Sequence, residues 1–378
     1  MAGINIGGYE VREFPDKIVE DLKQTPINWI RVHLLPNRHL SEKSDTSYLT
    51  YLDGINYLCR NGYNIIAPLE VGVEENTGTV WSYHLDKFIE ESYFDAECAS
   101  KQISKIIEEH HRQVIFGVEN EIDFKSWILQ SFPGIGWRKS FITWAIQALD
   151  VNLKYRRLKN ILKGILDTNS GAKTMTNVNA EDPRVFVDSI RNELKKRSPV
   201  LKKHSIELDD IYEKLIDWDW HTELKEIKKR LDVDYVGLDN YSNYIKKYPA
   251  RGSETGGKIT EAASLSGKQV LNAEFGYTTY RRFLRDRFFT FLGRPSASEM
   301  QRQFFENSLR SIENSPSIGT FPWVLLRYRP VPPNDPPNPK QECCFGLIQE
   351  DKEGEWKTMP SFTYYLEWLT RRLESQRS

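Results

Sequence analysis

Cysteine and long apolar runs are both scarce in this sequence. Its 378 residues include only four cysteines, Cys59, Cys98, Cys343 and Cys344, which are too few and too scattered for a disulfide framework, and no CxxC pair indicates a zinc site. No apolar stretch reaches the ~20 residues that a membrane span needs. The start, MAGINIGGYE, lacks a basic segment followed by an apolar one. We therefore expect a cytoplasmic protein with no membrane partner, unless a leader segment has been removed.

An excess of charge of one sign is also absent. The 52 Lys and Arg residues are balanced by 53 Asp and Glu residues, for a formal net charge of -1, which gives no electrostatic reason to expect a nucleic-acid partner. Residues 281–294, RRFLRDRFFTFLGR, mix arginine with phenylalanine, and at this net charge we interpret them as an amphipathic segment. The adjacent His110 and His111 lack any two-ligand spacing. We expect neither a metal nor another cofactor.

A Gly-rich phosphate loop is the third missing feature. The first apolar run continues into GGYE, which fits neither GxGxxG nor GxxxxGK[ST]. This absence disfavours an open doubly wound sheet, which is the alternative to the barrel predicted below.

Short apolar runs alternate along the chain with segments of helical apolar spacing, such as residues 17–24, 48–62, 98–111 and 186–197. The alternation repeats eight times and predicts an α/β fold, a closed (β/α)8 TIM barrel, as a single domain over residues 1–378. The runs are residues 4–11, 27–35, 63–71, 113–120, 172–178, 233–241, 268–276 and 319–326. The Pro-rich residues 327–342 follow the eighth run, and we expect them to form a stiff loop at the barrel mouth.

Two of the apolar runs end in carboxylates. VIFGVENEIDF carries Glu119, Glu121 and Asp123, and KQVLNAEFGY carries Glu274. Strict alternation would direct Glu119 and Glu121 towards the barrel axis. Such barrels carry their active sites at the strand ends, where an unpaired carboxylate would cost several kcal/mol, on the order of 3 to 5. We interpret Glu119 and Asp123 as helix caps or ion-pair partners, and Glu121 and Glu274 as a pair that faces one cavity.

A pair of carboxylates in one cavity suits the cleavage of glycosidic bonds. One carboxylic acid protonates the leaving oxygen, while the other carboxylate attacks the anomeric carbon or activates water there. A separation of about 5 Å gives retention of configuration, and a wider gap gives inversion.

The strand ends resemble those of glycoside hydrolase clan A, the retaining β-glycosidases with a TIM barrel. VENE and LNAEFG resemble the acid/base and nucleophile motifs, and INIGGYE resembles the strand-one opening of family 5 cellulases and mannanases. Agreement extends to WIRVHL, DYVGLDNYSNY and GTFPWVLL, and the segment FGLIQEDKEGEWKTMPSFTYYLEWL resembles the closing loop and helix of family 2 members. The histidines that family 5 carries near strands three and six are missing from APLEVG and GLDNYSN. The resemblance spans the chain and reaches the clan, not one family.

The resemblance implies roles for individual residues. Glu121 would be the general acid/base and Glu274 the nucleophile, and the charge of Arg31 and the phenol of Tyr241 would keep Glu274 ionised. Arg31 could equally be a buried structural ion-pair partner.

Three further residues would contact the sugar. Asn120 would donate to the sugar 2-hydroxyl, His33 would bond another hydroxyl, and Trp323 would stack on a pyranose face. Their structural alternatives are a helix cap for Asn120, a satisfied structural group for His33 and core packing for Trp323.

These features together predict a retaining glycoside hydrolase with a carbohydrate substrate. It would cleave β-linked gluco-, manno- or galacto-configured oligosaccharides or polysaccharides by two-glutamate double displacement. A transglycosylase would use the same carboxylates, and a non-catalytic carbohydrate-binding barrel would use them only to bond hydroxyls. The choice of sugar and linkage, endo or exo action and the oligomeric state stay open at this point.

Overall fold

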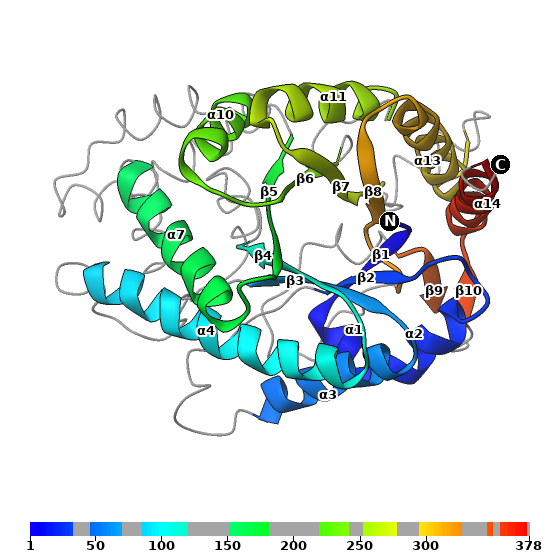
Figure 1. Cartoon of the computed structure of the whole chain (residues 1–378). Coiled ribbons are helices and arrows are strands. Elements are labelled where there is room, and N and C mark those ends of the chain that lie inside the picture. Colours follow the sequence, from blue (N-terminus) through cyan, green and yellow to red (C-terminus); the bar gives the residue numbers. More distant parts are fainter. Residues whose placement is uncertain are drawn as a thin grey trace, which may run out of the picture.

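The computed structural model contains eight parallel strands that neighbour one another in chain order, with helices around them (Figure 1). It describes residues 1–32, 46–69, 85–119, 151–180, 219–241, 252–277, 295–326, 346–350 and 356–375. The strands are β1 (Gly3–Ile6), β2 (Trp29–Val32), β3 (Asn64–Leu69), β4 (Val114–Val118), β5 (Lys173–Asn179), β6 (Tyr235–Asn240), β7 (Gln269–Phe275) and β8 (Ser317–Pro322). The (β/α)8 barrel predicted from the sequence is confirmed.

The barrel is nearly closed between its first and last strands. A parallel bridge joins Ala2 to Thr320, next to β1 and β8. The buried hydroxyl of Tyr365 lies 2.6 Å from the carbonyl oxygen of Gly3 and 2.9 Å from that of Thr320. A side chain of the last helix therefore supports the seam between the two ends of the sheet.

Helices cover the outside of the strands (Figure 1). They are α1 (Gly8–Glu13), α2 (Pro15–Leu22), α3 (Thr46–Arg60), α4 (Leu85–Glu109), α7 (Val151–Thr168), α10 (Trp220–Arg230), α11 (Thr255–Ser266), α13 (Ala297–Glu313) and α14 (Pro360–Ser375). Local sequence sets several ends: Asp219 and Ser296 cap α10 and α13, and α11 ends at Gly267 in the left-handed conformation. None of the helices in the described ranges has the length and hydropathy that crossing a bilayer requires.

Two details differ from the expected strands. The first run, residues 4–11, stops being a strand at Ile6, because α1 already begins at Gly8. Near the C-terminus, β9 (Ile348–Glu350) and β10 (Trp356–Thr358) form an antiparallel pair before α14, and Trp356 packs edge-on against Phe14. The Pro-rich residues 327–342 and the expected helix at 186–197 lie outside the described residues.

The barrel interior has an apolar layer below a polar one. The apolar layer consists of Trp29, Ile66, Ile115, Met175, Leu271, Ala273 and Phe321. Gly3 is required beside this layer, since a Cβ there would lie 2.0 Å from the ring of Phe321. Side chains two residues further along the strands point the same way, so Asn5 and Arg31 lie above the apolar layer, towards the strand ends.

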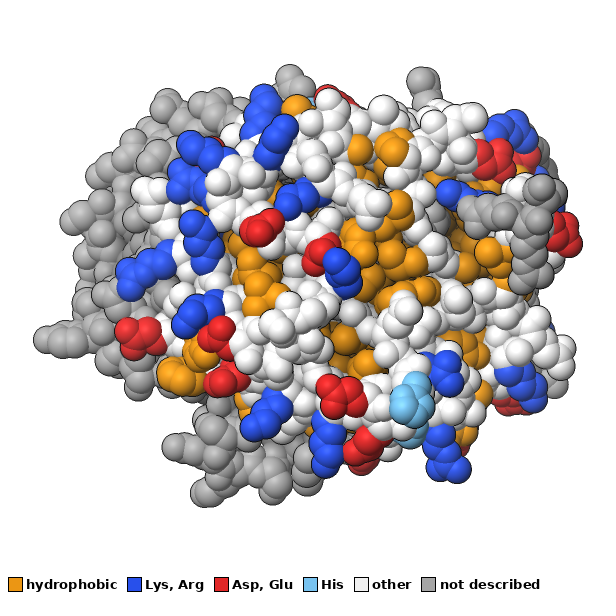
Figure 2. All heavy atoms as spheres, in the orientation of Figure 1, with side chains coloured by type: hydrophobic (Ala, Val, Ile, Leu, Met, Phe, Trp, Pro, Cys, Tyr) orange, Lys and Arg blue, Asp and Glu red, His pale blue; other side chains and the backbone are white. Residues whose placement is uncertain are grey.

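Charged side chains of both signs are interspersed on the surface. On the face in Figure 2, Lys and Arg side chains lie beside Asp and Glu side chains around apolar groups in the middle. This distribution agrees with the near-zero net charge of the whole sequence. The two cysteines in the described ranges, Cys59 and Cys98, are free thiols.

Candidate active site

Glu274 is a buried carboxylate near the C-terminal end of β7, with 4% of its surface exposed. Arg31 on β2 donates from Nη1 to its Oε1 and forms an ion pair with it. The hydroxyl of Tyr241, the residue directly after β6, donates to its Oε2. Both oxygens of Glu274 thus accept hydrogen bonds, and both donors favour the ionised carboxylate. The structure brings together three residues that the sequence singled out.

Asn5 on β1 holds Arg31 in place. Its Oδ1 accepts a 2.9 Å hydrogen bond from Arg31 Nη1, while its Nδ2 donates to the carbonyl oxygens of Ala273 and Phe321, both at 2.8 Å. One buried amide therefore links β1 to β2, β7 and β8 directly beneath Glu274. Asn5 was not among the residues predicted from the sequence. The signal that could have found it is a polar residue two positions after Gly3 in the first apolar run, on the same strand face.

A β-bulge directs Glu274 into the barrel. Leu238 pairs with Asn272 and Asp239 with Glu274, so Ala273 is an extra residue on β7. Ala273 belongs to the interior cluster, and strict alternation would send the next side chain outwards. The bulge lets consecutive residues both face the interior, as bulges near functional sites often do.

Asp239 adds a second buried carboxylate to the polar layer. It is fully buried on β6, paired in register with Glu274 on the neighbouring strand. Its Oδ2 accepts a 2.5 Å hydrogen bond from Asn177 Nδ2 on β5. Gly237, two residues earlier, faces the same interior, because a Cβ there would lie 2.7 Å from the Cβ of Asn177. Asp239 was missed because it lies inside an apolar run, not at its end.

Opposing effects act on the guanidinium of Arg31. Complete burial by itself would lower its pKa, but the negative charges of Glu274 and Asp239 and the hydrogen bond to Glu274 outweigh that effect and raise the pKa. Arg31 therefore stays protonated, as a buried cation between carboxylates.

Glu119, at the end of β4, has the ion-pair role that we predicted for it. Arg157 of α7 donates to it from both terminal nitrogens, from Nη2 to Oε1 at 3.0 Å and from Nη1 to Oε2. Each of the two residues is 1% exposed. Glu119 has a φ of 62°, in the left-handed region, so strand regularity ends here and its side chain meets an outer helix. Strict alternation along β4 therefore does not extend to Glu119.

Trp323 lies one residue past the end of β8. Its backbone N–H donates a 2.8 Å hydrogen bond to the carbonyl oxygen of Phe275, the residue after Glu274. The side chain is partly exposed, unlike those of Phe321 and Val324 around it. Trp323 therefore lies at the C-terminal ends of the strands, the same end of the barrel as Glu274.

The other predicted site residues lie outside the described residues. They are His33, directly after β2, and Asn120 and Glu121, directly after Glu119. Their roles stay predictions that rest on the sequence.

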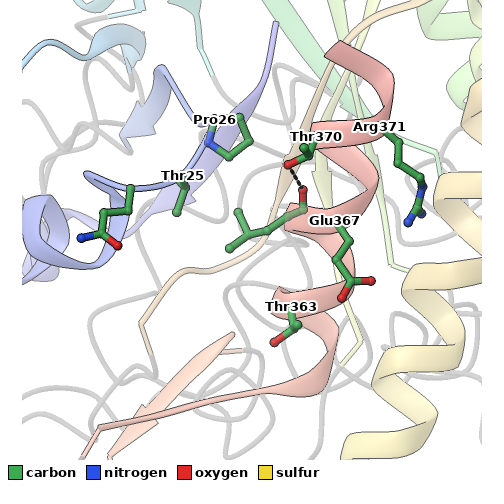
Figure 3. Close-up of a pocket in the computed structure, with 8 residues that line it drawn as sticks. Thr25, Pro26, Thr363, Glu367, Thr370 and Arg371 are labelled. Atoms are coloured by element: carbon green, nitrogen blue, oxygen red, sulfur yellow. Dashed lines mark hydrogen bonds between the residues drawn. The ribbon is translucent and has the colours of Figure 1, made fainter. Parts of the chain in front are cut away.

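A surface pocket of about 450 Å³ lies between the turn after α2 and the helix α14 (Figure 3). It is lined by Thr25, Pro26, Glu367, Thr370 and Arg371 among others. The turn leads into the N-terminal end of β2, so this pocket belongs to the opposite end of the barrel from Glu274. Barrels of this type carry catalysis at the C-terminal ends of the strands, and we assign the pocket no role.

Comparison with known proteins places the fold. No protein-family model matches the sequence, and no curated protein matches it. A solved structure described as β-glucosidase 1317 matches with a TM-score of 0.62 at 13% identity, over 97% of this chain and 89% of the other. A family 1 β-glucosidase from Thermotoga maritima matches with a TM-score of 0.60 at 12% identity, over 98% and 97% of the two chains. The exo-β-1,4-mannosidase Op5Man5 from Opitutaceae bacterium strain TAV5 matches with a TM-score of 0.59 at 15% identity, over 100% and 60%.

The chain has the fold of these glycosidases. At identities of 12 to 15% the similarity establishes the fold, and it confirms the barrel that the alternation of apolar runs and helical segments predicted. The chemistry must be argued from the site itself, because one barrel supports many reactions.

Proposed function

We propose that this protein is a retaining β-glycoside hydrolase of clan A, acting on β-linked hexosides, with Glu274 as the nucleophile and Glu121 as the general acid/base. The observation that carries the proposal is the placement of Glu274. It is a buried carboxylate at the C-terminal ends of the barrel strands, and Arg31 and Tyr241 donate hydrogen bonds to its two oxygens. Solved structures of the same fold include β-glucosidases and an exo-β-1,4-mannosidase, which supports a gluco- or manno-configured substrate.

The reaction has two balanced steps. Glu274 attacks the anomeric carbon while Glu121 gives its proton to the departing oxygen, which leaves a neutral glycosyl ester and an ionised Glu121. Water then attacks the same carbon and gives a proton to Glu121, and Glu274 departs as a carboxylate. Trp323, partly exposed beside Phe275, would support the sugar ring.

The test is hydrolysis of 4-nitrophenyl β-glucoside, mannoside, galactoside, xyloside and cellobioside by the wild type and two variants. Glu274→Ala should lose activity by about 10⁴-fold or more, and Glu121→Ala by about 10²- to 10⁴-fold. Added azide should give the β-glycosyl azide with Glu121→Ala, since the ester still forms, and the α-glycosyl azide with Glu274→Ala. Glu223→Gln, a change at a buried carboxylate between α7 and α10, is the matched control and should keep the wild-type specificity.

The stereochemistry of azide capture separates the two roles. Exchanged azide products would reverse the assignment of Glu121 and Glu274. A folded wild type that binds the sugars in calorimetry but cleaves none of them would replace the hydrolase with a carbohydrate-binding barrel.

A further inference from the structure

We infer that Asp239 is a positioning residue that serves as the permanent counter-ion of Arg31. It keeps that buried cation neutralised while the Glu274 carboxylate is esterified in the glycosyl-enzyme. The inference rests on the proposed function and deepens it. It concerns a residue that lies beside the proposed nucleophile without being the nucleophile itself.

The geometry places three charges in one buried layer. Arg31 and Asp239 are both fully buried, and Glu274 is almost so. Asp239 and Glu274 occupy paired positions on adjacent strands, and both act electrostatically on Arg31, as does Tyr241. Asn177 holds Asp239 through a 2.5 Å hydrogen bond, while Asn5 holds Arg31 from β1. The groups that face the cation on β2 thus come from β1, β6 and β7 and from the residue after β6.

The charge balance of the reaction gives the second carboxylate its purpose. In the free enzyme Arg31 has two anionic neighbours, Glu274 and Asp239. When Glu274 becomes an ester it loses its charge, and the negative charge of the site moves to Glu121. A fully buried guanidinium left without a carboxylate beside it is strongly unfavourable. With Asp239 in place, Arg31 keeps one buried counter-ion in the intermediate and in the transition state that leads to it.

The two halves of the reaction should therefore respond in opposite directions when Asp239 loses its charge. In Asp239→Asn, formation of the ester leaves Arg31 uncompensated, so the first step slows. Breakdown of the ester restores the Glu274 carboxylate next to Arg31, so the second step quickens. A residue with a purely structural role would slow both steps together.

The experiment uses 2,4-dinitrophenyl 2-deoxy-2-fluoro-β-D-glucoside and the corresponding mannoside as probes of the two steps. The rate of inactivation reports ester formation, the rate of reactivation after removal of excess probe reports ester breakdown, and intact-protein mass confirms the adduct. We expect Asp239→Asn to be inactivated about tenfold or more slowly and reactivated several-fold faster than the wild type. Asp239→Glu, which keeps the charge, should recover most of the wild-type ratio of the two rates.

Two controls keep the result interpretable. Glu223→Gln removes a fully buried carboxylate elsewhere in the fold and should leave both rates unchanged. If Asp239→Asn does not fold, Asn177→Ala serves as the second variant. It removes the hydrogen bond from Asn177 Nδ2 to Asp239 Oδ2, and it should shift the ratio of the two rates in the same direction by less.

The outcomes separate this inference from the proposed function. A wild type that forms no adduct with either probe and cleaves no glycoside would overturn the hydrolase proposal. A wild type that forms the adduct, together with an Asp239→Asn variant whose two rates are unchanged or fall by the same factor, would overturn the role of Asp239 alone.

Discussion

Two strand ends carry an arginine-bound glutamate, and they differ in where the arginine lies and in what else surrounds the carboxylate. At the end of β4, Glu119 is bound twice by Arg157, which comes from the outer helix α7. At the end of β7, Glu274 is bound by Arg31, which comes from a barrel strand, and also by Tyr241, which is only partly buried. The first carboxylate has both oxygens committed to one helix. The second faces the interior of the barrel.

The difference shows that an apolar run ending in an acid has two structural meanings. At Glu119 the backbone is in the left-handed region, so the regular strand β4 ends there. Its ion pair with Arg157 attaches α7 to the barrel. Glu274 directly follows the extra residue of a bulge and is bound by polar groups from β2 and from the residue after β6. The position of the arginine partner, on a helix or on a strand, separates structural anchoring from candidate chemistry.

The largest effect is expected from Arg31→Met. This change removes the cation beside Glu274 and Asp239, so kcat/KM should fall by about 10²- to 10³-fold, and the free energy of unfolding should fall by roughly 3 to 5 kcal/mol. Steady-state kinetics on the best aryl glycoside and urea unfolding measure the two losses. Loss of stability with unchanged kcat/KM would make this arginine a structural anchor, like Arg157.

Arg157→Met should instead affect mainly stability. It leaves the buried carboxylate of Glu119 without its cation and should lower the free energy of unfolding by about 3 to 5 kcal/mol. The double change Glu119→Leu with Arg157→Met should bring the free energy of unfolding back to within about 2 kcal/mol of the wild type. In the double variant, 2,4-dinitrophenyl glycosides, whose leaving group needs no acid, should be cleaved at the wild-type rate. A large loss on this substrate would mean that the β4 pair contributes to the chemistry at Glu274.

The comparison also shows where sequence reasoning stops. All eight strands, and the contacts of Arg31 and Tyr241 with Glu274, agree with expectations that depend on apolar runs and on the order of motifs. The bulge at Ala273 depends on the register between β6 and β7, which no local pattern encodes. Asp239 lies within an apolar run, so its burial beside Arg31 is a property of the closed barrel. The left-handed conformation of Glu119 likewise depends on its tertiary partner on α7.

Tyr241→Phe should have an intermediate and purely functional effect. The phenol donates to an oxygen of Glu274, and a hydrogen bond to a charged group is worth about 1.5 to 3 kcal/mol, so kcat/KM should fall about 10- to 100-fold. Because Tyr241 is partly exposed, the free energy of unfolding should change by less than about 1 kcal/mol. Equal initial rates for the wild type and Tyr241→Phe would show that Arg31 alone is sufficient to hold Glu274.

The smallest effect is expected at Asp219, a carboxylate that caps a helix and lies at neither the end of β4 nor the end of β7. It caps α10 by accepting from the backbone N–H of Thr222 at 2.8 Å and lies 3.0 Å from His221. Partial burial would raise its pKa, but the hydrogen bonds from Thr222 and His221 lower it to about 2. The folded pKa is thus below the unfolded value of about 3.9, so the stabilisation is present above pH ~4 and is lost as the pH falls towards 2.

Asp219→Ala should therefore reduce the free energy of unfolding at pH 7 by about 1 kcal/mol, with unchanged kcat/KM. Asp219→Asn keeps a capping oxygen without the charge, so it should retain most of the stability at pH 7 and lose stability less steeply between pH 4 and 2. Urea unfolding across that pH range measures both. Loss of activity in either variant would mean that the helix layer is coupled to the barrel interior, and the distinction between anchoring carboxylates and the carboxylate at β7 would then no longer hold.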